Sequence, residues 1–218
     1  MSYNVAIDGP AGAGKSTIAK LVAKEKGYIY VDTGAMYRGL AIHFLDEGIT
    51  PGETDKIIAA CADADVTICY ENGQQQVYLN GNNITARLRD EVVGNMASVS
   101  SAIPEVRAKL LDLQRNLAKT QNVIMDGRDI GTCVLPNADV KVYLTASVET
   151  RAERRYKELQ EKGIDCNLDE IAKDIAERDH RDMTREIAPL KQADNAVLVD
   201  SSYMTIDEVV SAIAALCK

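Results

Sequence analysis

The segment Gly9–Thr17, GPAGAGKST, constrains the fold more than any other part of the chain. It fits the pattern G-x-x-x-x-G-K-[ST], whose fixed positions are Gly9, Gly14, Lys15 and Ser16. The apolar run Tyr3–Ile7 predicts a buried strand before it, and an apolar pattern of helical spacing follows it until Gly27. The sequence therefore predicts a strand, a bare loop and a helix in succession.

Such a loop has the chemistry of an anion-binding site. Small residues let consecutive backbone N–H groups turn toward phosphate oxygens, and the N-terminus of the helix adds its positive dipole end. We expect Lys15 to reach the β and γ phosphates of a nucleotide and the Ser16 hydroxyl to coordinate Mg²⁺. A glycine-rich turn that completes only its own helix is the alternative. The predicted nucleotide-binding loop comprises Gly9, Pro10, Ala11, Gly12, Ala13, Gly14, Lys15, Ser16 and Thr17.

Further apolar runs alternate with helical segments, which is typical of an α/β fold. They are Tyr28–Val31, Asn122–Met125, Val140–Leu144 and Ala196–Val199. With the first strand they predict a five-stranded parallel sheet flanked by helices.

About ninety residues separate the second and third strands, far more than one crossover helix needs. Within them, alternating apolar residues on either side of Asn72-Gly73 predict a small antiparallel sheet at about 65–88, and a helix begins near Pro104. We therefore expect a core of residues 1–36 and 119–218 and an insertion of residues 37–118.

The composition narrows the class of protein. The chain has 218 residues, of which 46% are hydrophobic and 27% charged, as in ordinary globular proteins. Its net charge of −8 argues against a broad nucleic-acid surface. Five scattered cysteines predict neither disulfides nor a zinc site, and two histidines lack metal-ligand spacing. The start lacks a secretory signal pattern and the apolar tail Val209–Cys217 is too short to span a bilayer, so we expect a cytoplasmic protein.

Two clusters of arginine suggest further anion contacts. Arg151, Arg154 and Arg155 fall on one helical face, which predicts either a phosphate-facing lid or an exposed basic face. The segment RDHRDMTR also has helical spacing, and a structural ladder of ion pairs is the alternative there. Its members on one face are Arg178, Arg181, Asp182 and Arg185.

Two loops place polar side chains after predicted strands, at the edge where open α/β sheets bind ligands. The segment DTGAMYR supplies Thr33 and Arg38, and DGRDIG supplies Asp126, Arg128 and Asp129. We expect Asp126 to orient the waters of Mg²⁺.

Together these features predict phosphoryl transfer between two anionic ligands. The Asn-Lys-x-Asp segment of switch GTPases does not occur in the sequence. A phosphate acceptor is already ionised at pH 7, so positioning and charge neutralisation suffice without a strong general base. The residues expected to carry the catalysis are Lys15, Arg128, Arg154 and Arg185.

The chain resembles the bacterial cytidylate kinases, within the nucleoside monophosphate kinases. The resemblance rests on IDGPAGAGKST, DTGAMYR, DGRDIGTCVLP, ERDHRDMTREIAPL and VDSS, which occur in the family's order almost end to end. It implies a P-loop core, a monophosphate-binding insertion at 37–118 and a mobile lid at 150–165. The implied lid arginines, which contact ATP, are Arg151, Arg154 and Arg155. The implied reaction moves the γ-phosphate of ATP to CMP or dCMP with Mg²⁺ in a monomer, without nucleic-acid, membrane or obligate protein partners.

The resemblance also implies roles for single residues. Ser98, Arg107 and Asp129 face the cytosine ring, Asp182 the ribose, and Arg38, Arg128 and Arg185 the acceptor phosphate. Arg181 supports Asp182 and Asp129, while Thr33 and Arg178 complete the substrate-binding set. Thr33 stands where serine is common, and Cys133 where a small aliphatic residue is usual. A kinase of another monophosphate or small metabolite, or a non-catalytic nucleotide-binding module, remain the alternatives.

Overall fold

The computed structural model describes residues 2–218, which form two compact units. The core unit consists of Tyr3–Tyr30 and Asn122–Lys218, and the insertion unit of Val31–Gln121 with Ser2. The boundaries expected after residues 36 and 118 both fall inside the insertion unit as the structure defines it.

A five-stranded parallel sheet carries the core unit, as the sequence predicts. Its strand order is β2-β6-β1-β7-β8. The strands are β1 (Asn4–Asp8), β2 (Ile29–Asp32), β6 (Val123–Gly127), β7 (Val140–Thr145) and β8 (Val197–Asp200). The register pairs Asp8 with Gly127 and Ile7 with Asp126, so the carboxyl ends of β1 and β6 lie side by side.

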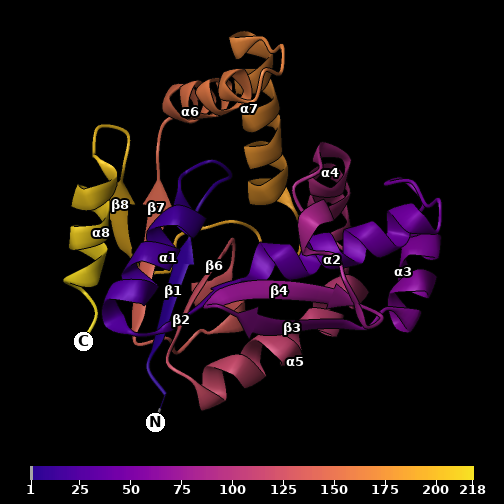
Figure 1. The fold of residues 1–218 in the computed structure, drawn as a ribbon, viewed down its shortest axis with the longest axis horizontal. Coiled ribbons are helices and arrows are strands. Elements are labelled where there is room, and N and C mark those ends of the chain that lie inside the picture. Colours follow the sequence, from indigo (N-terminus) through magenta and orange to yellow (C-terminus); the bar gives the residue numbers. More distant parts are fainter. Residues whose placement is uncertain (1) are drawn as a thin grey trace. The chain divides into compact units, whose positions relative to one another are not determined.

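Four helices and one π-helical turn complete the core unit (Figure 1). They are α1 (Lys15–Lys26), η2 (Ile130–Val134), α6 (Val148–Glu161), α7 (Leu168–Thr184) and α8 (Ile206–Ala214). Helix α1 packs on α8, and α6 packs on α7. Helix α1 ends at Gly27, whose φ of 68° is the left-handed conformation that glycine adopts readily, as predicted.

The hydrophobic centre of the core unit lies where α1 and α8 cover the sheet. Apolar residues of β1, β6 and β7 contribute to this core. Helix α8 begins with a capping box between Thr205 and Glu208. The largest contributors include Ile7, Ile18, Val22, Ile124, Leu144 and Ile213, all almost fully buried. This packing holds the start of α1, and so the loop before it, against the sheet.

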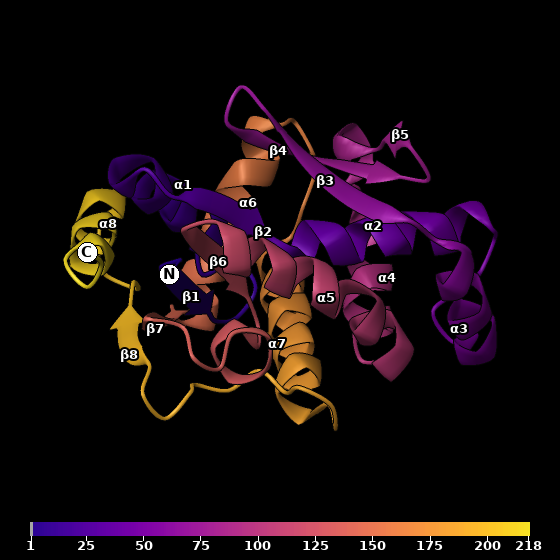
Figure 2. The same ribbon diagram turned by 90° about the horizontal axis from the view of Figure 1, so that it is seen from below.

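The insertion unit is built around α2 (Figure 2). Strands β3 and β4 pack on this helix, as do α4 and α5. The elements are α2 (Thr33–Asp46), α3 (Thr54–Asp63), β3 (Val66–Glu71), β4 (Gln74–Leu79), β5 (Asn82–Asn83), η1 (Thr85–Arg87), α4 (Glu91–Ser100) and α5 (Pro104–Thr120).

The predicted hairpin is confirmed in this unit. Strands β3 and β4 are antiparallel, and their turn contains Asn72 and Gly73 with φ of 52° and 74°. Two consecutive positive φ values are what a tight hairpin turn requires, which explains the Asn-Gly pair.

All five cysteines are free thiols, as expected. None of the helices within residues 2–218 is long and apolar enough to cross a membrane.

Candidate functional site

The loop between β1 and α1 depends on glycine for its shape. A Cβ on Gly9 would lie 1.9 Å from the backbone oxygen of Leu144, so no side chain fits there. Gly12 and Gly14 have φ of 76° and 87°, which favours glycine at both positions. The loop therefore turns tightly beside the end of β7 and enters α1 directly after Gly14.

Lys15 is buried at the first position of α1, and its Nζ donates a hydrogen bond to the carbonyl of Pro10 at 2.7 Å. Burial, followed by the nearby charge of Arg128, lowers the pKa of Lys15 from 10.5 to about 7. The carboxylates of Asp126 and Asp8 act in the opposite direction. An anion in this loop would favour the charged ammonium and raise that pKa again.

The Ser16 hydroxyl and the Asp126 carboxylate supply oxygen atoms for a metal beside the loop. The Ser16 hydroxyl donates to Asp126 Oδ2 at 2.9 Å, and the Tyr30 hydroxyl donates to Oδ1 at 2.8 Å. Hard oxygen atoms are the ligands that Mg²⁺ prefers, so these residues fit that metal. Within residues 2–218 there is no cluster of three or more His, Cys, Asp or Glu side chains that could hold a metal.

Asp8 is a buried site residue that the sequence analysis missed. Its two oxygens accept the N–H groups of Ile130 and Gly131, each at 2.7 Å. Burial raises the pKa of Asp8 from 3.8 to about 6, against the opposing effect of these two hydrogen bonds. The carboxylate thus fixes η2 directly after Asp129.

Arg128 and Asp129 each find a partner from the end of α7. Arg128 Nε donates to Asp182 Oδ2 at 2.9 Å, and Arg185 Nη2 lies 3.6 Å from Asp129 Oδ1. Both carboxylates are almost fully buried. The core unit therefore brings together four of the predicted acceptor residues.

The helical spacing predicted for the RDHRDMTR segment is wrong at its end. Helix α7 stops at Thr184, and Arg185 is extended with ψ of 141°. Its Nε donates to the carbonyl of Ala188 at 2.8 Å, so the side chain turns away from the helical face. Asp182 forms its ion pair with Arg128, which lies on another element, and not with a residue one turn earlier in α7.

Arg181 does not support Asp182 and Asp129 as predicted. Its side chain is exposed and makes no hydrogen bond or ion pair within residues 2–218; it lines a shallow hollow with Glu177 and His180. The buried carboxylates are held instead by Arg128 and Arg185. Arg178 is half-buried, and its charge is among those that lower the pKa of Lys15.

The three arginines of α6 are not one like-charge cluster. Arg151 is only 3% exposed and donates to Ala11 O at 2.9 Å and to Asp179 Oδ2 at 2.6 Å. Arg154 is exposed and donates to the carbonyl of Ser201 at 2.8 Å, and the exposed Arg155 pairs with Glu158. Each of the three arginines thus has partners within the protein, and Arg151 also holds the loop through Ala11.

The insertion unit holds the other predicted acceptor residues. Arg38 on α2 pairs with Asp32 at 2.9 Å, while Thr33 is buried at the start of the same helix. Arg107 on α5 donates to the carbonyl of Ser101 and lies 5.8 Å from the ring centre of Tyr37. The half-buried Ser98 on α4 has a hydroxyl without a hydrogen-bond partner within residues 2–218.

Asp8, Tyr30 and Asp32 each interact with a predicted site residue of their own unit, although the sequence analysis did not single them out. Asp32 is the N-cap of α2 and accepts the N–H of Ala35 at 2.8 Å. Asp8 and Asp32 are each the last residue of a strand, at the edge where α/β sheets place ligands. That position is the signal that could have identified them.

Proteins of known family have sequences similar to this chain. The family described as cytidylate kinase matches residues 5–218. A cytidylate kinase of Caldicellulosiruptor saccharolyticus is 49% identical over 98% of this chain and 94% of its own length. A cytidylate kinase of Lactobacillus johnsonii is 47% identical over 98% of this chain and 93% of its own.

Solved structures with little sequence identity show the same fold. A gluconokinase from Sinorhizobium meliloti has a TM-score of 0.50 at 14% identity and covers 98% of this chain and 90% of its own. A shikimate kinase from Bacteroides thetaiotaomicron has a TM-score of 0.50 at 13% identity, covering 98% of this chain and 97% of its own. The chain thus shares its fold with these two kinases.

Proposed function

The chain belongs to the cytidylate kinase family, and we propose how its residues carry out phosphoryl transfer from ATP to CMP or dCMP. The products are ADP with CDP or dCDP. The observation that carries the proposal is the arrangement of Lys15, Ser16 and Asp126 at one sheet edge, with buried arginine–carboxylate pairs in the same unit.

ATP binds in the loop Gly9–Thr17, where backbone N–H groups and the N-terminus of α1 receive the phosphates. Lys15 holds the β and γ phosphates, because within residues 2–218 its buried ammonium has only the neutral carbonyl of Pro10 as a hydrogen-bond partner. Arg151 keeps the loop in shape through Ala11, while the exposed Arg154 and Arg155 approach the nucleotide from α6.

Ser16 and Asp126 are the proposed residues for Mg²⁺, Ser16 as a direct ligand and Asp126 through bound water. When bound, the metal would supply positive charge that neutralises the charge developing on the phosphates. The Tyr30 hydroxyl keeps the Asp126 carboxylate oriented toward Ser16.

The acceptor phosphate is bound by Arg38, Arg128 and Arg185. Each of these guanidinium groups has a carboxylate partner, which fixes its direction without removing its charge. Asp182 takes the ribose, and Thr33, Arg178 and Arg181 complete the substrate-binding set.

Cytosine is read by Asp129, Arg107 and Ser98 in this proposal. The exocyclic amine of cytosine is a donor that a carboxylate accepts, and its ring and carbonyl acceptors suit a guanidinium. Uracil has a carbonyl oxygen in place of the amine. This oxygen and the Asp129 carboxylate are both hydrogen-bond acceptors, so they would repel each other. Sites of this kind discriminate strongly, because the wrong base leaves buried polar groups unpaired.

The transfer itself needs little proton chemistry. An acceptor phosphate oxygen attacks the γ-phosphorus in line, and the bond to the β-phosphate oxygen of ATP breaks. Lys15, Arg128, Arg154 and Arg185 stabilise the charge on the transferred group and hold the two reactants in line. The acceptor enters as a phosphate anion, so the residues act by position and charge.

A coupled assay of diphosphate formation tests the proposal. ATP and Mg²⁺ are supplied with CMP, dCMP, UMP or AMP at equal low concentration. Turnover confined to CMP and dCMP supports both the reaction and the reading of the base. Equal turnover of all four contradicts the cytosine assignment, and nucleotide binding without turnover favours a non-catalytic module.

Asp129→Asn tests the base-reading role directly. The amide cannot replace a carboxylate as a double acceptor, so the ratio of kcat/KM for CMP over UMP is expected to fall at least tenfold. Asp174→Asn, on the exposed part of α7, is the matched control and leaves the ratio unchanged. An unchanged ratio in Asp129→Asn would remove this residue from base recognition.

We further propose that the enzyme works as a monomer in the cytoplasm, with small-molecule nucleotides as its partners. Light scattering at several protein concentrations tests the monomer, which a concentration-dependent mass would contradict.

A further inference from the structure

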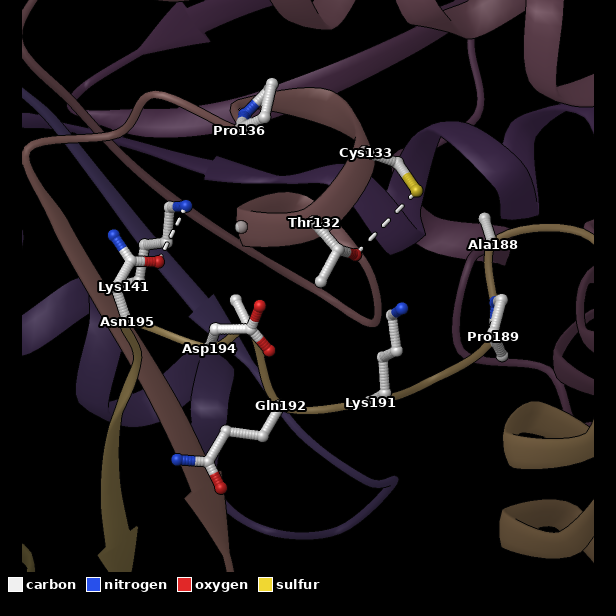
Figure 3. Close-up of a pocket in the computed structure, with 12 residues that line it drawn as sticks. Thr132, Cys133, Pro136, Lys141, Ala188, Pro189, Lys191, Gln192, Asp194 and Asn195 are labelled. Atoms are coloured by element: carbon white, nitrogen blue, oxygen red, sulfur yellow. Dashed lines mark hydrogen bonds between the residues drawn. The ribbon is translucent and has the colours of Figure 1, made fainter.

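A second cavity, of about 370 Å³, lies in the core unit and is lined by η2, β7 and residues 188–195 (Figure 3). Its size is at the small end of ligand pockets in proteins. None of the residues assigned above to ATP, Mg²⁺ or CMP lines it. The lining residues with charged or amide side chains that matter here are Lys141, Lys191, Asp194 and Asn195.

Lys141 is a buried cation with a neutral partner. Its side chain projects from β7, is 8% exposed as a residue, and donates from Nζ to Asn195 Oδ1 at 2.9 Å. Within residues 2–218 no carboxylate forms an ion pair with it. An ammonium has three donors, and buried charges are normally paired with an opposite charge. This cation therefore has capacity for an anionic partner.

The phosphate loop also contains a buried cation with a neutral partner, Lys15. Lys15 and Lys141 are the buried lysines within residues 2–218, and each ammonium donates to an uncharged amide oxygen. The buried guanidinium of Arg151, by contrast, has a carboxylate partner in Asp179. In the kind of partner that it has, Lys141 thus resembles Lys15 and differs from Arg151.

Two exposed side chains set the charge at the mouth of the cavity. Lys191 extends toward the turn that carries Thr132, and Asp194 follows three residues later on the same segment (Figure 3). Among the lining residues Lys141 and Lys191 give two cations against the one carboxylate of Asp194, in a chain whose net charge is −8. The nearby carboxylate of Asp8 does not line the cavity and accepts the N–H groups of Ile130 and Gly131. The local excess of positive charge favours an anion over a cation as the occupant.

We propose that this cavity binds the phosphate or carboxylate group of a small metabolite, with Lys141 and Lys191 as its cationic ligands. The occupant would lie against the turn that Asp8 fixes. A Cβ on Gly131 would lie 3.1 Å from Lys141 Cδ and 3.3 Å from Asp8 Oδ2, so the lysine stem and the carboxylate pack around one glycine.

Two substitutions separate this site from the phosphate loop. Asn195→Asp places a carboxylate on Lys141 and satisfies the charge from within the protein, so it should abolish anion binding with little effect on folding. Lys141→Met removes the charge and keeps the length of the stem. Lys173→Met, on the exposed face of α7, is the matched control.

The binding is measured by NMR titration of the whole chain with inorganic phosphate and, separately, with malonate. The amides of Gly131 and Thr132 report on the cavity, and those of Gly12 and Gly14 report on the phosphate loop. We expect saturable cavity shifts in the wild type and in Lys173→Met, with at least tenfold weaker affinity in Asn195→Asp and Lys141→Met, while the shifts at Gly12 and Gly14 stay the same.

A response to one probe alone assigns the group as phosphate or carboxylate. The proposal is overturned if the wild type shows no saturable shift at Gly131 and Thr132 with either probe, or if both cavity variants respond as the wild type does. Should Lys141→Met fail to fold, Asn195→Asp decides alone.

Discussion

The effect of Lys15 on catalysis and its effect on CMP binding can be measured separately. Lys15→Met is expected to lower kcat by about 10²–10³ or more, because the ammonium stabilises charge that develops on the transferred phosphate. The affinity for CMP should change little, since the proposal places Lys15 on the ATP phosphates. Steady-state kinetics and calorimetric titration of CMP measure the two effects, and equal losses in both would reassign Lys15 to acceptor binding.

Asp8 links the protonation of one carboxyl to the stability of the fold. Its folded pKa of about 6 lies above the ordinary value of 3.8, so folding favours the protonated form. The free energy of unfolding should therefore fall as pH rises from about 4 to about 6, by roughly 3 kcal/mol at most. Below this window the contribution of Asp8 is fully present and no longer changes with pH, because both states are protonated.

Asp8→Asn should remove that pH dependence. Urea unfolding at pH 4, 5, 6 and 7 measures it, with Asp174→Asn as the exposed control. If the wild type and Asp8→Asn differ by a constant free energy at every pH, the burial of Asp8 does not shift its ionisation.

The partners of the charged residues could not be predicted from the sequence. Spacing along a helix grouped Arg151 with Arg154 and Arg155, and Asp182 with Arg178, so it paired neighbours within one helix. The structure pairs Arg151 with Asp179 and Arg128 with Asp182, over 28 and 54 positions of the chain. Such pairs depend on how α6, α7 and β6 pack, which local patterns do not contain.

The buried side chain of Arg151 links helix α6 to both α7 and the phosphate loop. Arg151→Met should destabilise the protein by about 3–5 kcal/mol, because it leaves Asp179 buried without its partner. Arg155→Met removes an exposed pair with Glu158 and should cost about 1 kcal/mol or less. Urea unfolding of both variants tests this, and a similar small cost in both would mean that Arg151 serves ATP alone.

The regular elements were predictable because their signals are local. The five strands, the helix ended by Gly27 and the Asn72-Gly73 hairpin each follow from a short stretch of sequence. The π-helical turn Ile130–Val134 was not predicted, because the Asp8 carboxylate from another strand accepts its first N–H groups. The early end of α7 likewise depends on Ala188, which receives the side chain of Arg185.

At the scale of the whole molecule, the proposed acceptor residues belong to both compact units. Arg38→Met in the insertion unit and Arg128→Met in the core unit should each raise the Kd for CMP about tenfold or more, because each removes a charged hydrogen bond to the phosphate. Arg89→Met, on an exposed part of the insertion unit, is the control. Calorimetric titration measures the Kd, and a loss confined to one unit would restrict CMP binding to that unit.

The close approach of the backbone to Gly9 limits which second mutations could compensate for a side chain at this position. The atom that excludes a side chain at this position is the main-chain oxygen of Leu144, 1.9 Å from where a Cβ would stand. Every amino acid has that oxygen, so no replacement at position 144 can make room. In a genetic selection that starts from Gly9→Ala, restored growth should come from reversion at codon 9 and not from a compensating change at codon 144.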